Sequence, residues 1–588
     1  MRETNGHRIP MNRLTVILAL VSFVSLSFTS RVINGQSING QSINSQSINS
    51  QSIAHSMPAL PTVIVVRPSA WHSKLEDWNI YRSVDYRLQF IDSTANPYLL
   101  RNAVFDAVNK AGSPVEAIVL CGDVAEPPLN FKDTNPTRPI TPTFSLDTSI
   151  KLGQLQTPTL VTDALYGDID DDGCPDIPVG RLPAKNAEEL RRMLGRSIMY
   201  ERSTDVGVWR DQVHVTAGVG GFGMLADATI ESVARRYLTE GIPDRFQLQM
   251  TYASLTSPYC PDPTKLKDTF LSRVNRGGMF WVYIGHGWID CLDRFTYGKT
   301  EELICSAEDA KRFSSPNGPP IAVLLACYTG AFDAKVDCFA ERLLQQPDGP
   351  IAVIAGSRVT MPYGLSQLAG EMLESCFVER TATLGKIVGD AKKATWLDAA
   401  DASVSRYNSE PSTIKLKSKY QTAIEQMAKS LSPPDHSLVA ERREHVRLMN
   451  LLGDPLLKIR HPHAIDLRSA ETADAGSNIS VSFVAPWTGK ARIELYLNRD
   501  RLPTDLVSIG NYTGTIEQHS QMQTNYENAN QLQLWAHELD VNKGDCAFEV
   551  PITSEMRGKY VLRVRMQSAS DWAVGSKRIT VRRVKDLR

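Results

Sequence analysis

The chain has 588 residues, too many for one ordinary hydrophobic core, and this length favours two or three domains. Its 64 basic residues are balanced by 65 acidic ones, and the sequence contains no long basic run. The composition therefore gives no electrostatic reason to expect nucleic acid or an anionic membrane surface as a partner.

The first 30 residues are predicted to be a signal peptide. Arg2, Arg8 and Arg13 give a positive start, and the apolar run 14–28 follows, with small residues near its end. This run is shorter than the roughly 20 apolar residues that span a bilayer, so we expect cleavage and no stable membrane insertion. The mature chain is expected to be secreted, or to lie at the cell surface or in the periplasm.

Residues 31–60 form a low-complexity repeat with the pattern I-N-[GS]-Q-S. The repeat is polar and has too few apolar side chains to build a core. We therefore interpret it as a flexible tether between the signal peptide and the folded part of the chain.

From 61 to 460 the sequence alternates between strand and helix patterns. Buried strands are predicted at Thr62–Val66, Val115–Cys121, Met279–Ile284, Ile321–Ala326 and Ile351–Ala355. Helices are predicted around 99–108, after the capping-box-like pair Asn186 and Glu189, at Ile230–Leu238 and at Leu266–Val274. Short apolar strands separated by amphipathic helices indicate an α/β fold with a mainly parallel sheet covered on both faces. We expect an N-terminal subdomain at 61–205 and a catalytic subdomain at 206–460.

The C-terminal region from 466 to 588 has a different pattern. Apolar residues alternate with polar ones at 479–483, 493–497, 560–566 and 579–581, and helical signals are weak. This period of two predicts an immunoglobulin-like β-sandwich. We expect it to stabilise the enzyme or dock it to a surface rather than to catalyse.

Nine cysteines are spread irregularly along the chain, and none forms a C-x-x-C pair. The spacing argues against a dense disulfide scaffold or a zinc ribbon, and the odd number leaves at least one thiol unpaired. Cys291 and Cys338 are predicted to be either core thiols or disulfide partners.

Two predicted strands end in residues that can do chemistry. Trp281–Ile284 leads into Gly285-His286-Gly287, and Ile321–Ala326 leads into Cys327. In open α/β sheets reactive groups gather at the carboxyl ends of strands, and nucleophilic catalysis needs a thiol, a nearby base and free peptide N–H groups. A strand-ending Cys is usually a small core residue and a lone G-H-G is often a turn, but the two together favour a catalytic site.

The surrounding sequence resembles the gingipain-type cysteine peptidases, relatives of caspases and legumains. The resemblance is carried by seven segments in the expected order: LYGDIDDDGCPDIPVGRLP at 165–183, YER at 200–202, FWVYIGHG at 280–287, LLACYTGAFD at 324–333, DCFAE at 337–341, IAVIAGS at 351–357 and NLLGDP at 450–455. It covers about 60–460. It implies a caspase-like α/β domain and an endopeptidase that acts on protein or peptide substrates and needs no cofactor for its chemistry.

The resemblance also implies roles for individual residues. Cys327 attacks the scissile carbonyl, His286 protonates the leaving amine, and the N–H groups of Gly287 and Cys327 form the oxyanion hole. Asp176 precedes Val179-Gly180-Arg181, at the place where well-studied members carry a Glu that orients the His. A basic P1 residue is the expected substrate preference, with Glu188 or Glu189 as the nearest acidic candidates.

An acidic segment precedes that motif. Asp168, Asp170 and Asp172 with Gly173 have the spacing D-x-D-x-D-G of calcium loops, but Val179 stands where an EF-hand has its bidentate Glu. The segment is either a solvated acidic turn or a structural calcium site. A bound calcium ion would fix the loop that carries Asp176.

Two other functions fit the same sequence. Some gingipain relatives transfer secreted proteins at the cell surface, so a sortase-like transpeptidase would use the same Cys327–His286 pair. A non-catalytic surface-binding scaffold is the alternative outside enzymology, although both reactive residues are present. The sequence carries no signal for an oligomeric state.

Overall fold

The computed structural model describes residues 59–124, 140–150, 158–220, 241–397, 425–426, 428–430 and 432–583. The predicted signal peptide at 1–30 lies outside the described residues, as do all but the last two residues of the tether at 31–60. The helix predicted at Ile230–Leu238 also lies outside them. The described residues all belong to one compact unit.

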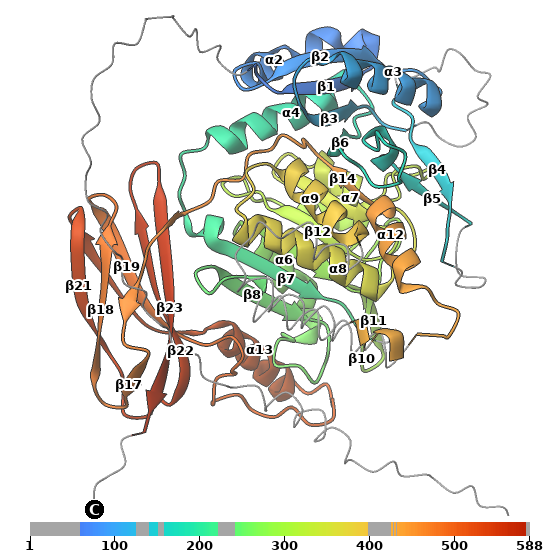
Figure 1. Ribbon diagram of the computed structural model, residues 1–588. Coiled ribbons are helices and arrows are strands. Elements are labelled where there is room, and N and C mark those ends of the chain that lie inside the picture. Colours follow the sequence, from blue (N-terminus) through green and yellow to red (C-terminus); the bar gives the residue numbers. More distant parts are fainter. Residues whose placement is uncertain are drawn as a thin grey trace, which may run out of the picture. The chain divides into compact units, whose positions relative to one another are not determined.

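A ten-stranded sheet occupies the centre of this unit, in the order β2-β1-β3-β6-β14-β13-β12-β9-β7-β8 (Figure 1). The strands are β1 (Thr62–Arg67), β2 (Arg87–Asp92), β3 (Val115–Cys121), β6 (Val179–Leu182), β7 (Gln212–Ala217), β8 (Gln247–Tyr252), β9 (Phe280–Ile284), β12 (Ile321–Leu325), β13 (Ala352–Gly356) and β14 (Met449–Leu452). Every neighbouring pair is parallel except β13 and β14. The predicted α/β fold with a mainly parallel sheet is confirmed.

Helices cover both faces of the sheet because the central strands are apolar on both sides. On β9, Trp281 and Tyr283 belong to the core formed with α4 (Ala187–Arg202), α6 (Leu266–Val274) and α7 (Phe339–Gln345). Phe280, Val282 and Ile284 face the opposite core, formed with α8 (Pro362–Leu373) and α9 (Leu384–Trp396). The remaining helices of this region are α2 (Glu76–Arg82), α3 (Pro97–Lys110) and α12 (Leu438–Leu448).

Strand β14 joins two groups of strands that are far apart in the sequence. It pairs with β6 on one side and with β13 on the other. Just after it, the buried carboxylate of Asp454 accepts hydrogen bonds from Trp78 Nε1 at 2.9 Å and Arg82 Nη2 at 2.7 Å. Arg82 also pairs with Glu201 at 2.7 Å, and the three charged side chains are almost fully buried. This cluster fastens the N-terminal strands to the end of the α/β region.

Two short antiparallel pairs lie outside the main sheet. They are β4 (Phe144–Asp147) with β5 (Thr159–Thr162), and β10 (Arg294–Tyr297) with β11 (Thr300–Leu303).

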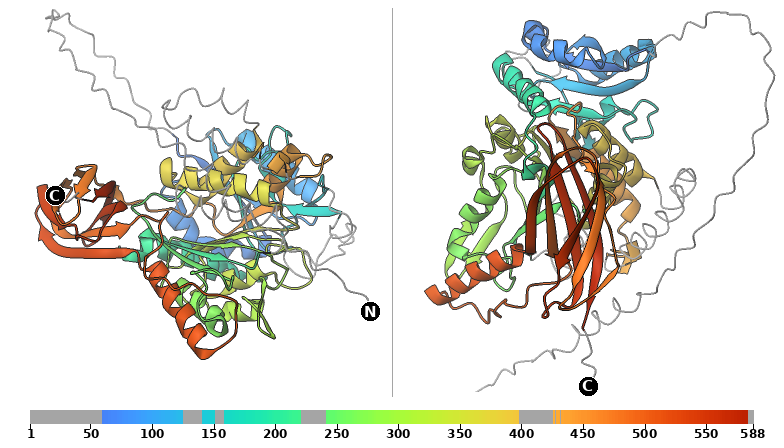
Figure 2. Two further views of the ribbon diagram at one scale, coloured as in Figure 1. Left: turned by 90° about the horizontal axis from the view of Figure 1, so that it is seen from below. Right: turned by 90° about the vertical axis from the view of Figure 1, so that its left-hand side faces the viewer.

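The C-terminal region contains two antiparallel-rich sheets (Figure 2). The larger has the order β15-β23-β22-β19-β20, with β17 beside β23, and the smaller has the order β16-β18-β21. Their strands are β15 (His463–Ala464), β16 (Arg468–Ser469), β17 (Thr472–Asp474), β18 (Asn478–Ala485), β19 (Gly489–Leu497), β20 (Gln533–Val541), β21 (Gly544–Pro551), β22 (Gly558–Gln567) and β23 (Trp572–Arg582). Strands were predicted at four of these places, and the immunoglobulin-like assignment stays a prediction.

Helix α13 (Ile516–Asn530), between β19 and β20, was not predicted. Its sequence is mostly polar, and only Met522, Asn525, Tyr526 and Ala529 are buried. Asn530 Nδ2 and Oδ1 bond the backbone of Met250 in β8 at 3.0 and 2.8 Å. Such a helix is stabilised by its tertiary contacts rather than by an apolar stripe that a sequence pattern would reveal.

All nine cysteines are described, and none of them is in a disulfide. Cys291 and Cys338, for which a disulfide was one of two predictions, are buried free thiols. No helix in the described part of the chain combines the length and the apolar character that crossing a bilayer requires.

Candidate active site

The two predicted catalytic residues follow neighbouring parallel strands. Ile284 of β9 and Leu325 of β12 are directly paired in the sheet. His286 and Cys327 each lie two residues beyond that pair. Since paired strands are about 4.8 Å apart, the backbone segments that carry the imidazole and the thiol lie side by side at one edge of the sheet.

Cys327 differs from most of the other cysteines in its exposure. Seven of the nine are buried, and burial raises the pKa of each of those thiols. Cys327 is half-buried, and its Sγ accepts a hydrogen bond from the backbone N–H of Thr360 at 3.3 Å. The Thr360 hydroxyl lies 3.5 Å from the same sulfur. The thiol can in turn donate to the carbonyl oxygen of Thr360 at 3.7 Å, so Thr360 fixes the position of the sulfur.

Peptide N–H groups are available beside the sulfur. A Cβ on Gly287 would lie 2.8 Å from the carbonyl oxygen of Cys327 and 2.7 Å from Cγ2 of Thr329, so the two segments pack too closely for a side chain there. Among the described residues, neither the N–H of Gly287 nor that of Cys327 donates a backbone hydrogen bond. Both predicted oxyanion donors are therefore free to bind a developing negative charge.

The backbone of His286 is held from two sides. Its carbonyl oxygen accepts a hydrogen bond from the Tyr283 hydroxyl at 2.8 Å, and its N–H donates to the carboxylate of Asp293. The His286 ring lies 6.1 Å from the ring of Trp288, which is 44% exposed. The half-buried imidazole is thus fixed at its backbone beside an aromatic surface open to solvent.

Asp293 is a functional candidate that the sequence did not reveal. It is 4% exposed, and its carboxylate accepts hydrogen bonds from the N–H groups of Val219 at 2.8 Å and Arg294 at 2.9 Å. Burial raises the pKa of Asp293, and the neighbouring charge of His286 opposes that rise. The carboxylate therefore interacts electrostatically with His286. The only signal in the sequence was an acid seven residues after the His.

Asp176 lies elsewhere. It precedes β6, which is separated from β9 by β14, β13 and β12 in the sheet. Its side chain is exposed, and its Oδ2 accepts a hydrogen bond from the N–H of Ile169 at 2.9 Å. No contact of Asp176 in the described residues involves His286, so its orienting role stays a prediction.

Both acidic candidates for a pocket that binds a basic P1 residue already pair with other groups of the protein. Glu188 pairs with Arg191 at 2.8 Å on the exposed first turn of α4. The Glu189 carboxylate accepts from Lys185 N–H at 2.9 Å and from the Asn186 side chain at 3.1 Å. The predicted helix start is confirmed, and of the two carboxylates only that of Glu189 bonds groups at this start.

The predicted metal ligands are partly brought together. One carboxylate oxygen from each of Asp168, Asp170 and Asp176 lies within 4.8 Å of the others. Asp172, the third predicted ligand, is not in this group, and its Oδ1 accepts a hydrogen bond from the N–H of Cys174 at 2.6 Å.

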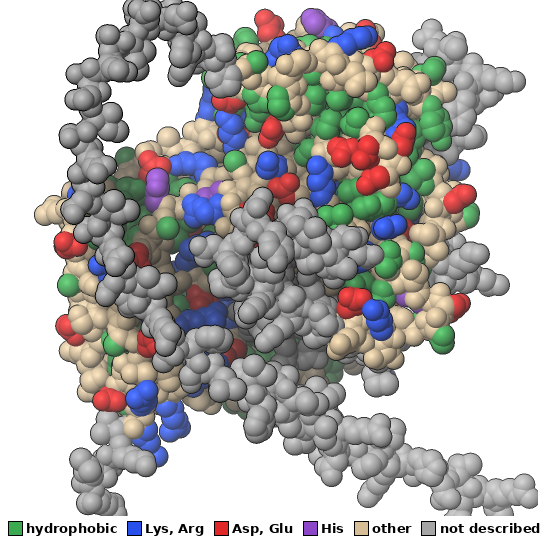
Figure 3. All heavy atoms as spheres, in the orientation of Figure 1, with side chains coloured by type: hydrophobic (Ala, Val, Ile, Leu, Met, Phe, Trp, Pro, Cys, Tyr) green, Lys and Arg blue, Asp and Glu red, His purple; other side chains and the backbone are tan. Residues whose placement is uncertain are grey.

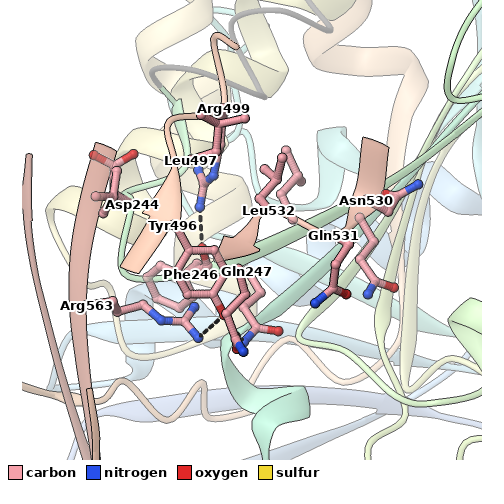
Figure 4. Close-up of a pocket in the computed structure, with 14 residues that line it drawn as sticks. Asp244, Phe246, Gln247, Tyr496, Leu497, Arg499, Asn530, Gln531, Leu532 and Arg563 are labelled. Carbon is pink, nitrogen blue, oxygen red and sulfur yellow. Dashed lines mark hydrogen bonds between the residues drawn. The ribbon is translucent and has the colours of Figure 1, made fainter. Parts of the chain in front are cut away.

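A cavity of about 150 Å³ lies between β8 and the C-terminal sheets (Figure 4). Its polar groups already have partners within the protein. Arg499 donates to the carbonyl oxygens of Ile242 at 2.7 Å and of Phe246, and Arg563 donates to Tyr496 at 3.1 Å. Because β8 is three strands from β12, we assign this cavity to the packing between the two regions rather than to the candidate active site.

Three comparisons relate the chain to known proteins. The model of peptidase family C25 matches residues 57–460. Gingipain R2 of Porphyromonas gingivalis strain W83 is 24% identical over 309 residues, which cover 50% of this chain and 36% of gingipain R2. A gingipain R1 of the same species is 24% identical over 292 residues, covering 48% of this chain and 25% of its own. The chain thus spans only about a third or less of these curated relatives.

Among solved structures, the Arg-specific cysteine proteinase gingipain R is similar with a TM-score of 0.47 and 16% identity, over 89% of this chain and 98% of that one. The family match covers more than half of the chain and contains both strand ends described above. The chain therefore belongs to peptidase family C25, which confirms its resemblance to the gingipain-type cysteine peptidases.

Proposed function

We propose that this protein is a cysteine endopeptidase in which Cys327 is the nucleophile and His286 the acid–base partner. The observation that carries the proposal is the pairing of Ile284 with Leu325, which places the thiol and the imidazole two residues beyond the same point of the sheet. A half-buried thiol with hydrogen-bond donors beside it is suited to nucleophilic attack.

The reaction proceeds in two steps. Cys327 Sγ, having given its proton to His286, attacks the scissile carbonyl, and the N–H groups of Gly287 and Cys327 bind the resulting oxyanion. When the C–N bond breaks, His286 passes the proton to the leaving amine and a thioester remains. Water then attacks the thioester, His286 accepts its proton, and release of the carboxylate restores the thiol.

Asp293 is proposed as the positioning residue for His286. The buried carboxylate of Asp293 accepts a hydrogen bond from the backbone N–H of His286, and its charge interacts with the imidazole. A nearby anion stabilises the imidazolium that forms during the first step. Neither interaction is available to Asp176, whose described contacts are with the acidic loop.

The substrates proposed are proteins or peptides of the extracellular space. Secretion rests on the N-terminal signal pattern, and the C-terminal sheets would dock or stabilise the enzyme. A basic P1 preference is proposed from the resemblance of the sequence to the gingipain-type peptidases. Glu188 and Glu189 do not support this preference, because the Glu188 carboxylate pairs with Arg191 and the Glu189 carboxylate caps the start of α4.

The test is active-site labelling of purified protein with peptidyl acyloxymethyl ketones that differ only at P1, followed by mass mapping. We expect a single adduct on Cys327 that is absent in Cys327→Ala and in His286→Ala. Cys546→Ala is the matched control because Cys546 is the other cysteine that is not buried. An adduct only on Cys546, or none with any P1 residue, would contradict the proposal.

The P1 panel separates the parts of the proposal. Faster labelling by Arg or Lys than by Leu or Asp supports the basic preference, and the reverse order removes that preference while keeping the peptidase. Adding a peptide amine during turnover tests the alternative of transfer. Hydrolysis predicts a free carboxylate on the product, whereas a transpeptidase would join the amine to the new carboxyl end.

A further inference from the structure

The loop before β6 matches the spacing of a calcium-binding loop at its first acidic residues and again further along, at Asp176. Counting Asp168 as position one, Asp170 is at position three and Asp176 at position nine, all of which are ligand positions in EF-hand loops. The structure brings one oxygen of each of these three carboxylates within 4.8 Å of the others. Acidic side chains gather at one place near β6 on the face drawn in Figure 3.

One of these carboxylates has an unused buried oxygen. Asp168 is 2% exposed, and its Oδ2 accepts the N–H of Gly173 at 3.0 Å. Its Oδ1 is buried and has no hydrogen-bond partner. A buried carboxylate oxygen without a partner is costly, and a cation held by the three carboxylates would remove that cost.

The backbone of the loop also has the required shape. Gly173 occupies position six, where EF-hand loops need a glycine for a sharp turn, and its φ is +93°. A Cβ there would lie 1.9 Å from Nη2 of Arg447 and 2.9 Å from the ring of Trp396. The loop is therefore packed against α9 and α12 and is held in its folded form from outside.

Two basic side chains contact the loop: Arg447 donates to the Gly173 carbonyl oxygen, and Arg101 is engaged at Asp171 and at the backbone of Asp168. Arg101 forms an ion pair with Asp171 and donates at 2.7 Å to the carbonyl oxygen of Asp168. Among the described ion pairs, none involves the carboxylate of Asp168, Asp170 or Asp176. None of the three gathered carboxylates thus forms an ion pair within the described part of the chain, although the charge of Arg101 also acts on Asp168.

From this geometry we infer that Asp168, Asp170 and Asp176 bind a calcium ion. The donor set is all oxygen, which calcium prefers and zinc does not. The irregular loop suits the flexible coordination of calcium better than the strict octahedron of magnesium. Since Val179 replaces the bidentate Glu at position twelve, we expect weak binding, with a dissociation constant on the order of 10⁻⁴ M.

The loop is connected to the candidate active site through α12. Arg447 Nε donates to the Gly173 carbonyl oxygen at 3.1 Å. Two residues earlier on the same helix, His445 Nε2 accepts the N–H of Met361 at 2.7 Å. Met361 follows Thr360, which contacts the sulfur of Cys327. A bound ion would therefore steady the helix that holds the segment beside the nucleophile.

Terbium luminescence gives a direct test because Trp396 packs against the loop. Terbium replaces calcium at oxygen sites and emits when a nearby tryptophan is excited. In the metal-stripped Cys327→Ala protein we expect terbium emission that calcium displaces and magnesium does not. Trp396→Phe should lose most of the emission and still bind calcium by calorimetry.

Matched variants locate the site. Asp168→Asn and Asp176→Asn should each weaken calcium binding by about tenfold or more, because ligand charge sets affinity in such loops. Asp171→Asn is the control, since Asp171 is in the same loop with a φ of +62° that Asn tolerates and is outside the group of three. Equal calcium affinity in all three variants would overturn the inference, as would the absence of calcium binding to the unmodified protein.

Thermal unfolding separates a binding defect from a folding defect. In chelator, Asp168→Asn should be at least as stable as the unmodified protein, because it removes an uncompensated buried charge. In excess calcium the order should reverse. A variant that is less stable under both conditions, with calcium giving both proteins the same gain in Tm, would show that Asp168 is only structural.

Discussion

The backbone N–H of Thr360 points at the sulfur of Cys327 over 3.3 Å. This contact ties the end of β12 to the segment that follows β13, and the hydroxyl of the same threonine lies 3.5 Å from the sulfur. The nucleophile is thus positioned by a residue 33 places away in the sequence. The carbonyl oxygen of Thr360 lies 3.7 Å from the sulfur as well, so three groups of one residue hold the nucleophile in place.

Thr360→Val removes the hydroxyl and keeps the shape and the backbone donor. We expect the second-order rate of labelling at Cys327 to fall roughly 3- to 10-fold, the value of one modest hydrogen bond. Thr360→Ser, which keeps the hydroxyl, should stay close to the unmodified rate. Equal rates for the Val variant and the unmodified protein would show that only the backbone N–H matters.

Gly287→Ala should abolish most of the activity while the protein remains folded. The new Cβ would lie 2.8 Å from Cys327 O and 2.7 Å from Thr329 Cγ2, so the two strand ends must move apart. We expect kcat/KM to fall by about 100-fold or more, as when an oxyanion donor is lost. Gly195→Ala on α4 is the control, because nothing lies within 4 Å of its added Cβ. Unchanged kinetics in Gly287→Ala would argue against this oxyanion hole.

Asp293→Asn tests the positioning of His286. The amide keeps the shape of the carboxylate but loses its charge, so we expect kcat to fall by about 10- to 100-fold with little change in KM. Asp176→Asn, assayed with saturating calcium, should leave kcat within about twofold. The opposite result, with a large loss in Asp176→Asn and none in Asp293→Asn, would restore Asp176 as the orienting acid.

Arg82→Met leaves the buried carboxylates of Glu201 and Asp454 without their counter-charge. We expect the free energy of unfolding to fall by about 3–5 kcal/mol, measured by urea denaturation. The triple variant that adds Glu201→Gln and Asp454→Asn should recover part of the loss. Arg191→Met, which breaks an exposed pair with Glu188, is the control and should change stability by less than about 1 kcal/mol.

A loss of less than about 1 kcal/mol in Arg82→Met would mean that water reaches the two carboxylates.

Glu341 should give the fold a pH dependence. Burial, with the negative charge of Asp123 second, raises the pKa of Glu341 to about 8. A carboxyl whose folded pKa exceeds its unfolded pKa takes up a proton on folding, so its contribution to stability falls as pH rises from about 4.5 to about 8. Glu341→Gln should flatten this fall and raise Tm at pH 8 by a few degrees, roughly. The exposed Glu379→Gln should have no such effect, and identical pH profiles for Glu341→Gln and the unmodified protein would contradict the shift.

Strands and helices with strong local patterns could be predicted from the sequence. The bounds of Val115–Cys121 and Leu266–Val274 are the same in prediction and structure, because the first is an apolar run followed directly by Gly122 and the second keeps helical apolar spacing up to a turn at Gly277. The neighbouring positions of His286 and Cys327 followed from the rule that reactive groups gather at strand ends.

The rest depends on contacts between distant residues. Asp293 becomes a neighbour of His286 only because the intervening loop folds back. No local sequence pattern predicts that this loop reverses the chain. Asp176 shows the opposite case. Its place in a family motif suggested that it orients His286, whereas its described contacts join it to the acidic loop. The insertion of β14 between β6, to which it is parallel, and β13, to which it is antiparallel, rests on few residues and on no local signal.

The position of β14 has a consequence for how the protein is made. This strand is the last of the ten in the sequence and one of the central ones in the sheet, so the α/β region cannot close until residue 452 has left the ribosome. Arg82 and its partner Asp454 are likewise 372 residues apart in the sequence. Contacts of such long range form slowly, so the growing chain stays open through most of its synthesis. Under the secretion proposed above, such a delay would keep the chain open for passage through a membrane and the peptidase inactive until β14 has been made.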